Sequence, residues 1–196
     1  MGKTRLEAFS DGVLAIIITI MVLELKVPHS PTLEALAELL PVFLSYVLSF
    51  IFVGIYWNNH HHMLHTVTRV NGAILWANLH LLFWLSLIPF TAGWMGENHF
   101  ETLPVALYGF VMMMAGIAYP ILQQVIIASQ GPHSKLKIAI GGDWKGRASG
   151  GIILVGIVTA FFNTWLACAI YAVIAVLWFI PDRRIEHNLV HEPAEE

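Results

Sequence analysis

Long apolar runs alternate with short polar segments along this chain. A helix needs about 20 mostly apolar residues to cross the roughly 30 Å hydrocarbon core of a membrane. The runs predict six such helices, over residues 6–25, 40–62, 72–95, 103–126, 148–162 and 163–180. The last two share one apolar stretch of about 30 residues, too long for a single crossing, which predicts a tight turn at Asn163 and Thr164. The expected fold is all-α: a polytopic membrane protein in which residues 1–196 form one six-helix transmembrane domain.

The basic residues predict how these helices are oriented. If the N-terminus is cytoplasmic, nine Lys and Arg residues fall on the cytoplasmic side and Lys26 alone falls on the other. The nine are Lys3, Arg5, Arg69, Lys135, Lys137, Lys145, Arg147, Arg183 and Arg184. Cytoplasmic loops of membrane proteins carry an excess of Lys and Arg, so we expect both termini to be cytoplasmic.

The composition supports a membrane environment. Hydrophobic residues make up 57% of the chain and charged residues only 12%, whereas a typical soluble domain is about a quarter charged. A soluble fold of this size has too little interior to bury so much apolar surface. The net charge of −3 gives no reason to expect a nucleic-acid partner, and a single cysteine, Cys168, excludes an internal disulfide.

Polar residues recur near the cytoplasmic ends of the first three predicted helices. At 1.5 Å per residue they lie roughly 6–8 Å inside, the last two slightly deeper: Ser10, Asp11, Asn58, Asn59, His60, His61, Asn78 and His80. Arg5 and Asp11 are six residues apart, about 120° around the helix, so they do not form an i,i+4 pair. We therefore expect Asp11 to bond to another helix, with His80 or Asn78 as candidate partners. These polar residues either join the helices or also take part in gating or proton sensing.

The run that contains His60, His61, His62 and His65 has a spacing seen in metal sites, because His61 and His65 are i,i+4 neighbours on one helical face. No acidic residue or cysteine adjoins the run, and it falls at the predicted membrane boundary. We therefore expect histidines of the interface or of the polar network, and no metal. Their pKa values near neutrality would let them respond to cytoplasmic pH.

The first predicted helix opens with a specific motif, R-x-x-x-F-S-D, formed by Arg5, Phe9, Ser10 and Asp11. This motif resembles the signature of the transmembrane protein 175 family of potassium channels. Residues 78–90, which end in Ser-Leu-Ile-Pro-Phe, are also similar to the family. Animal relatives carry two six-helix repeats in one chain, whereas this chain resembles the prokaryotic type, which has one repeat and assembles as a homotetramer.

The resemblance implies a potassium channel subunit in the prokaryotic plasma membrane, with permeant K⁺ and no cofactor. The first helices of four subunits would line the pore, and the signature residues would form interhelical bonds that support it. The family positions fall on Ile16, Ile20 and Leu23 for the hydrophobic constriction and on Thr19 for selectivity. Independently, these four positions follow the i, i+3, i+4, i+7 spacing and share one helical face.

The implied mechanism differs from that of common potassium channels, because no T-V-G-Y-G carbonyl filter is present. A ring of isoleucines would gate by dewetting, and selectivity would depend on pore width and the Thr19 hydroxyls, which predicts weak discrimination between potassium and sodium. A secondary transporter or proton-coupled cation transporter is the alternative, although only Pro120 suggests a broken helix. A membrane enzyme built on the histidines with Asp11 as base has no evident nucleophile, so we expect no enzyme.

Overall fold

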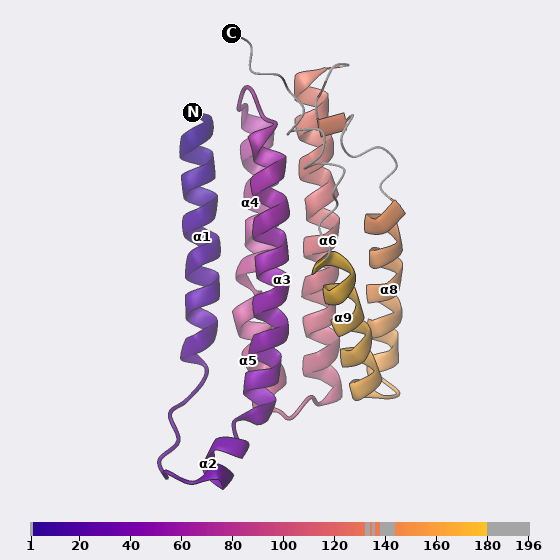
Figure 1. The fold of residues 1–196 in the computed structure, drawn as a ribbon. Coiled ribbons are helices and arrows are strands. Elements are labelled where there is room, and N and C mark those ends of the chain that lie inside the picture. The colour runs from indigo at the N-terminus through magenta and orange to yellow at the C-terminus, as the bar shows by residue number, and fades with distance from the viewer. Residues whose placement is uncertain (1, 132–133, 135, 138–143, 180–196) are drawn as a thin grey trace.

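The computed structural model describes residues 2–131, 134, 136–137 and 144–179. Eight helices can be given bounds within these ranges, which contain no strand (Figure 1). The helices are α1 (Lys3–Leu23), α2 (Leu33–Ala37), α3 (Leu40–His65), α4 (Gly72–Ser86), α5 (Ile88–Glu97), α6 (Thr102–Gln130), α8 (Trp144–Ala160) and α9 (Thr164–Phe179). The predicted all-α class is confirmed for this part of the chain.

Four stretches are long and apolar enough to cross a membrane. They are Lys3–Leu23, Leu40–His65, Gly72–Glu97 and Thr102–Gln130, of 21, 26, 26 and 29 residues. The first four predicted runs differ from them by at most four residues at either end, the largest difference being 126 against 130. The apolar parts of α8 and α9 are shorter.

The third stretch is divided into α4 and α5 at Leu87. Pro89 lies in the first turn of α5, where a proline has no N–H to donate and its ring would clash with the carbonyl four residues earlier. The N–H of Leu87 instead bonds the Trp84 carbonyl at 3.2 Å and closes α4 with a tighter turn. Pro120, by contrast, lies inside a continuous α6, so the broken helix that it suggested is absent.

Short polar side chains start three of the helices. The side chains of Thr32, Asn71 and Asn163 accept hydrogen bonds from backbone N–H groups three residues later, at 3.3, 2.9 and 3.0 Å. Such bonds satisfy amides at a helix N-terminus that have no partner within the helix. The Asn163 cap follows the end of α8 at Ala160 and precedes α9. It therefore confirms the predicted turn between the last two apolar runs.

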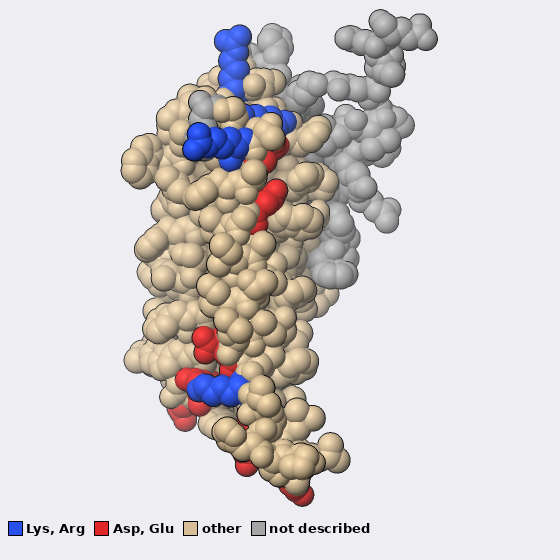
Figure 2. Space-filling model, turned by 90° about the vertical axis from the view of Figure 1, so that its left-hand side faces the viewer, with Lys and Arg blue, Asp and Glu red and all other residues tan. Residues whose placement is uncertain are grey.

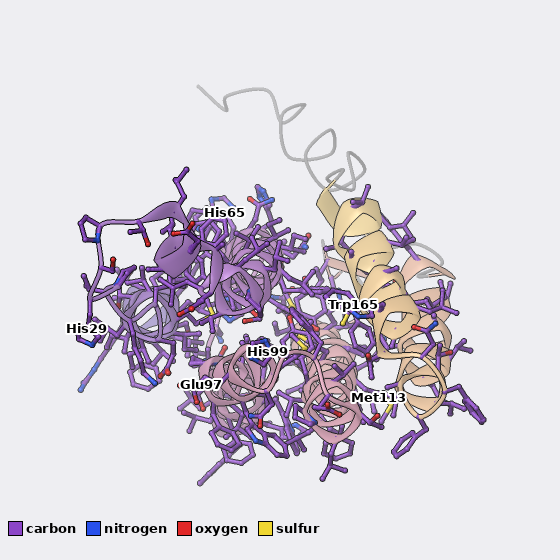
Figure 3. The ribbon with its side chains drawn as sticks, turned by 90° about the horizontal axis from the view of Figure 1, so that it is seen from below. His29, His65, Glu97, His99, Met113 and Trp165 are labelled. Carbon is purple, nitrogen blue, oxygen red and sulfur yellow. The ribbon has the colours of Figure 1, made fainter. Side chains whose placement is uncertain are left out.

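The bundle is built around α6, which packs against α4, α5, α8 and α9. Helix α1 packs against α3, α4 and α5 and lies at one edge, with α8 and α9 at the opposite edge (Figures 1 and 3). In its most apolar stretch α6 is 50% buried, whereas α1 is only 28% buried. Helix α1 is therefore attached to the bundle along one side.

Charged side chains gather toward the two ends of the bundle (Figure 2). Lys3 donates to the carbonyl of His65, which places the start of α1 beside the end of α3. Lys26 pairs with Glu97 at the opposite end. The uncharged band between the two ends suits a lipid environment. The predicted cytoplasmic C-terminus, with Arg183 and Arg184, lies outside the described residues.

Candidate functional site

Helix α1 has two faces with opposite environments. Leu6, Ser10, Leu14, Ile17 and Met21 are buried against the neighbouring helices. Their spacing of three or four residues forms one stripe along the helix. The residues of the predicted constriction lie on the other side and are exposed: 58% for Ile16, 43% for Ile20 and 76% for Leu23.

Thr19 belongs to the exposed face of α1. Its hydroxyl lies 3.0 Å from the carbonyl oxygens of both Ala15 and Ile16, to which it donates. A hydroxyl has one proton and two acceptor lone pairs, so these backbone bonds occupy the donor and leave the oxygen free to accept. The exposed face of α1 therefore presents an oxygen ligand among apolar side chains.

A buried hydrogen-bond chain connects α1, α4 and α3 behind this face. The Asn78 amide donates to the Ser10 hydroxyl at 3.0 Å, and Ser10 donates to the Leu6 carbonyl at 2.9 Å. Nε2 of His60 lies 2.7 Å from the Asn78 carbonyl oxygen. Because that oxygen can only accept, His60 carries a proton on Nε2. The side chains of Ser10, Asn78 and His60 are at most 1% exposed.

This hydrogen-bond chain agrees in part with the polar network predicted from the sequence. It confirms that Ser10 and Asn78 lie in an interhelical polar network, and it adds His60, which the sequence places at a similar depth. The prediction that Asp11 bonds to His80 or Asn78 is wrong. Asp11 instead accepts a hydrogen bond from Nε1 of Trp57 on α3 at 3.1 Å, so the interhelical bond exists with a different partner.

Three other predicted site residues lie outside this network. His80 accepts a hydrogen bond at 3.0 Å from Trp84, one turn along the same helix. Arg5 is exposed and has no side-chain bond within the described part of the chain, and Phe9 is 47% exposed. Arg5 and Phe9 lie on the face of α1 that the monomer leaves uncovered, where the bundle offers them no neighbouring helix.

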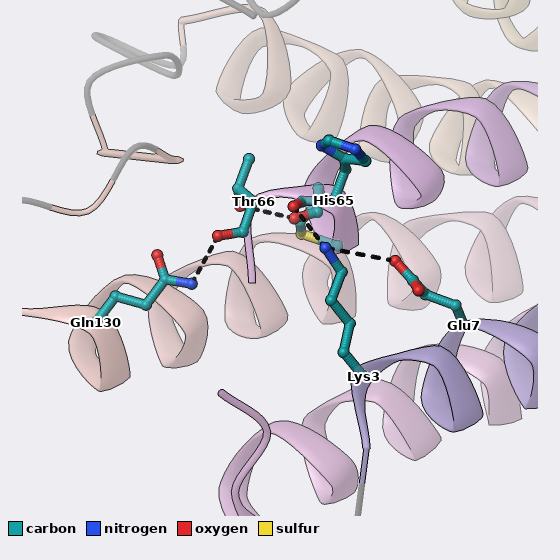
Figure 4. A network of polar contacts seen from close by, with 6 residues as sticks. Lys3, Glu7, His65, Thr66 and Gln130 are labelled. Carbon is teal, nitrogen blue, oxygen red and sulfur yellow. Dashed lines mark hydrogen bonds and ion pairs between the residues drawn. The ribbon is translucent and has the colours of Figure 1, made fainter. Parts of the chain in front are cut away.

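A second set of contacts anchors the N-terminal end of α1 (Figure 4). Lys3 donates to the His65 carbonyl at 2.7 Å and lies 3.8 Å from Glu7. Gln130 at the end of α6 donates to the Thr66 carbonyl at 3.0 Å. The last carbonyls of a helix have no partner within it and attract positive charge. These donors therefore join α1 and α6 through the end of α3.

The histidines of the run differ in burial. His60 is buried, whereas His61 and His65 are exposed; the His61 ring lies 6.3 Å from that of Trp57 and 5.6 Å from that of His62. Among the described residues no group of three His, Cys, Asp or Glu side chains is placed to hold a metal ion.

At the opposite end, Lys26 and Glu97 form an ion pair at 2.5 Å between the segment after α1 and the end of α5. Figure 3 shows Glu97 near His99 at this end of the bundle. The hydrogen bond and the charge of Glu97 raise the pKa of Lys26 above its ordinary value. Both side chains are well exposed, so water screens the pair and limits its contribution to stability.

Known proteins resemble the chain in sequence and in structure. A family model described as the endosomal/lysosomal potassium channel TMEM175 matches residues 5–89. A potassium channel from Chryseobacterium sp. (strain P1-3) is 57% identical over 189 residues, which is 96% of this chain and 98% of that protein. The crystal structure of a lysosomal potassium-selective channel TMEM175 homolog from Chamaesiphon minutus superposes with a TM-score of 0.79 at 28% identity.

The two bacterial matches are close to full length, since the crystal structure covers 92% of this chain and 97% of its own. The endosomal/lysosomal proton channel TMEM175 of Gallus gallus is 35% identical over 101 residues, which is 45% of this chain and 20% of that protein. The segment that the family model matches contains both the R-x-x-x-F-S-D motif and Asn78. The chain therefore belongs to the TMEM175 family.

Proposed function

We propose that this protein is a subunit of a potassium-permeable channel in the cell membrane. Four copies surround a pore lined by the exposed face of α1. The observation that carries the proposal is the division of α1 into one face held by buried contacts and another, with Ile16, Thr19, Ile20 and Leu23, that the subunit leaves uncovered. Its relatives in Chryseobacterium and Chamaesiphon are both described as potassium channels.

Small residues also lie on this face of α1. Ala8, Gly12 and Ala15 are exposed along it, and small side chains let helices approach closely in membranes. A face that combines small residues, branched aliphatic residues and a threonine suits a narrow axis between identical helices.

Conduction through such a pore is controlled by wetting. Ile16 lies about 20 Å along α1 from its first residue, and a ring of four such side chains excludes water when it is narrow. Thr19 lies one turn further, where its hydroxyl oxygen can accept a dehydrating cation. Hydroxyls on flexible side chains coordinate less rigidly than a backbone carbonyl filter, so the preference of this pore for potassium over sodium is modest.

The proposed topology has six crossings with both termini cytoplasmic. Helices α8 and α9 contain 17 and 16 residues, about 24–26 Å at 1.5 Å per residue, near the lower limit for a spanning helix. Their antiparallel packing, with a turn after Ala160, supports a hairpin that enters and leaves the membrane. An even number of crossings places the end of α9 on the same side as the start of α1.

The reversal potential of the purified protein in planar bilayers under a potassium/sodium gradient tests this function. A channel of this kind shifts the reversal toward the potassium equilibrium potential and carries current that does not saturate at low concentration. A saturating flux that depends on a second gradient would indicate a transporter instead. Recording the current under a pH gradient without potassium tests whether the protein conducts protons, the activity named for the animal relatives.

The variant Ile16→Asn tests the position of the gate. An amide at this ring wets the constriction, so we expect a severalfold larger current with the same reversal potential. Val22→Asn is the matched control, because Val22 is 45% exposed on α1 but lies about 120° around the helix from Ile16. Equal currents in the two variants would place the gate elsewhere.

A further inference from the structure

A cavity of about 280 Å³ lies among α3, α6, α8 and α9, and no residue of α1 lines it. Apolar side chains form most of its wall, including Phe52, Met112 and Ile174, and no charged residue lines it among those the structure describes. Its volume is near the lower end of the range for small-molecule sites, about 300–1,000 Å³. Because an ion would lose its hydration there without a counter-charge, the cavity suits only an uncharged ligand.

Three polar groups of the cavity wall have unused hydrogen-bonding capacity. Gln123 is only 7% exposed, and neither its amide nor the hydroxyl of Tyr56 has a hydrogen-bond partner among the described residues. The Asn59 amide donates to the Ile55 carbonyl at 2.9 Å, which leaves its side-chain oxygen available. No fully buried side-chain nitrogen or oxygen among the described residues lacks a partner, so the unpaired atoms of these groups face the open space of the cavity. Together these groups offer donors and acceptors to one hydroxyl or amide.

The cavity continues into a groove between α6 and α8. The two share Gly116, Pro120, Gln124, Gly146 and Gly150 as lining residues. A Cβ at Gly150 would meet no atom within 4 Å, and one at Gly116 would meet only the Tyr56 hydroxyl, at 3.8 Å. The absence of side chains at these glycines leaves a lateral opening between the helices.

The outer part of the groove is apolar and faces the surroundings of the bundle. Met113, labelled on α6 in Figure 3, lines it, as do Ile117, Ile121 and Leu154, which are 45%, 41% and 53% exposed. The lining of the groove extends along α6 from Met113 to Val125, about 18 Å at 1.5 Å per residue. An elongated apolar groove along a membrane-spanning helix is accessible to the acyl chains of lipids.

We infer that the cavity and groove form one binding site for an uncharged single-chain amphiphile taken from the membrane. Its hydroxyl or amide head lies in the cavity beside Gln123, Tyr56 and Asn59, and its chain lies in the groove between α6 and α8. The site is separate from the exposed face of α1 and does not depend on the proposed pore. A cavity filled only with water is the competing interpretation, because several waters fit into this volume.

Native mass spectrometry of the purified full-length protein with added 1-dodecanol tests the site. We expect saturable binding of one alcohol per subunit. Dodecane lacks the head group, and dodecanoate carries a charge, so both should bind at least about tenfold more weakly. Dodecanoate is the critical comparison, since the Lys145 ammonium lies 5.1 Å from the ring of Trp178, which lines the cavity. Equal binding of all three probes, or none by the alcohol, would overturn the inference.

Two variants locate the bound alcohol. Gly116→Leu fills the cavity and should abolish binding, whereas Gly54→Leu is the matched control, because Gly54 also has open space at its Cβ but does not line the cavity. Gln123→Leu should weaken binding about tenfold while the melting temperature stays equal or rises, since it replaces an unpaired amide by an apolar group. Undiminished alcohol binding in Gln123→Leu would remove the head-group site even if Gly116→Leu failed to fold.

Discussion

Ile16 and Ile17 are neighbours in the sequence and chemically identical, yet they occupy opposite environments. Ile16 is 58% exposed and Ile17 is 3% exposed, because consecutive residues of a helix point about 100° apart. Ile17 belongs to the face of α1 that packs against the bundle, and Ile16 belongs to the face that we assign to the pore. The comparison teaches that the packed face of α1 and the face of the proposed pore differ by side of the helix rather than by segment.

The largest expected effect is on the buried face. Ile17→Ala should lower the free energy of unfolding by about 2–5 kcal/mol, because it removes buried methyl groups and leaves a cavity. Ile16→Ala should change subunit stability by no more than about 0.5 kcal/mol, since most of its side chain is uncovered. Thermal or denaturant unfolding in detergent measures both. Equal losses would show that the exposed face is also packed in the folded protein.

The buried hydrogen-bond chain should have the next largest effect. Asn78→Ala leaves the Ser10 hydroxyl and His60 Nε2 without their partner, at a cost of about 1–3 kcal/mol. His80→Ala is the control, since His80 lies on the same helix and bonds only Trp84 among the described residues. Similar melting temperatures for the two variants would contradict the idea that the buried hydrogen-bond chain holds α1 against the bundle.

The Trp57–Asp11 bond should contribute less, because it is exposed. Trp57→Phe keeps an aromatic ring and removes the donor, so we expect a loss of about 0.5–1 kcal/mol, matched by Asp11→Ala. In the double variant the losses should not add, which a double-mutant cycle detects. Fully additive losses would mean that the two side chains do not interact.

The smallest effect is expected at the opposite end. Lys26→Gln should leave the melting temperature unchanged within error at physiological salt, because the pair with Glu97 is exposed and screened. A raised lysine pKa stabilises the fold below the ordinary value of 10.5, and this contribution is lost as the pH rises through the folded-state pKa. A clear drop in melting temperature at pH 7 would show that the pair is shielded from solvent.

The polar residues near one end show how far the sequence could predict the site. Counting depth along helices placed Ser10, Asp11, His60 and Asn78 at one level, and the structure joins three of them. Depth does not specify rotation, however, and the partner of Asp11 depends on how α3 is turned about its axis. The role of Trp57 as a donor to Asp11 had no signal in the sequence.

The cavity beside α6 had no signal in the sequence either. Gly116 and Gly150 lie far apart in sequence, and only the packing of α6 against α8 brings them to one opening. Gln123 reads as an ordinary amide in an apolar helix until its neighbours are known. Sites that are formed by missing side chains on different helices become visible only when the helices are assembled.

The sequence by itself determined the six apolar stretches, the turn before α9 and the stripe at residues 16, 19, 20 and 23. These depend on local properties, namely hydrophobic length, capping residues and the 3.6-residue period. Only the tertiary structure decided that this stripe is the uncovered side of α1, that His60 closes the chain through Asn78 to Ser10, and that Trp57 bonds Asp11. Such pairings depend on the rotation and offset of whole helices, which many weak contacts determine together and no short segment encodes.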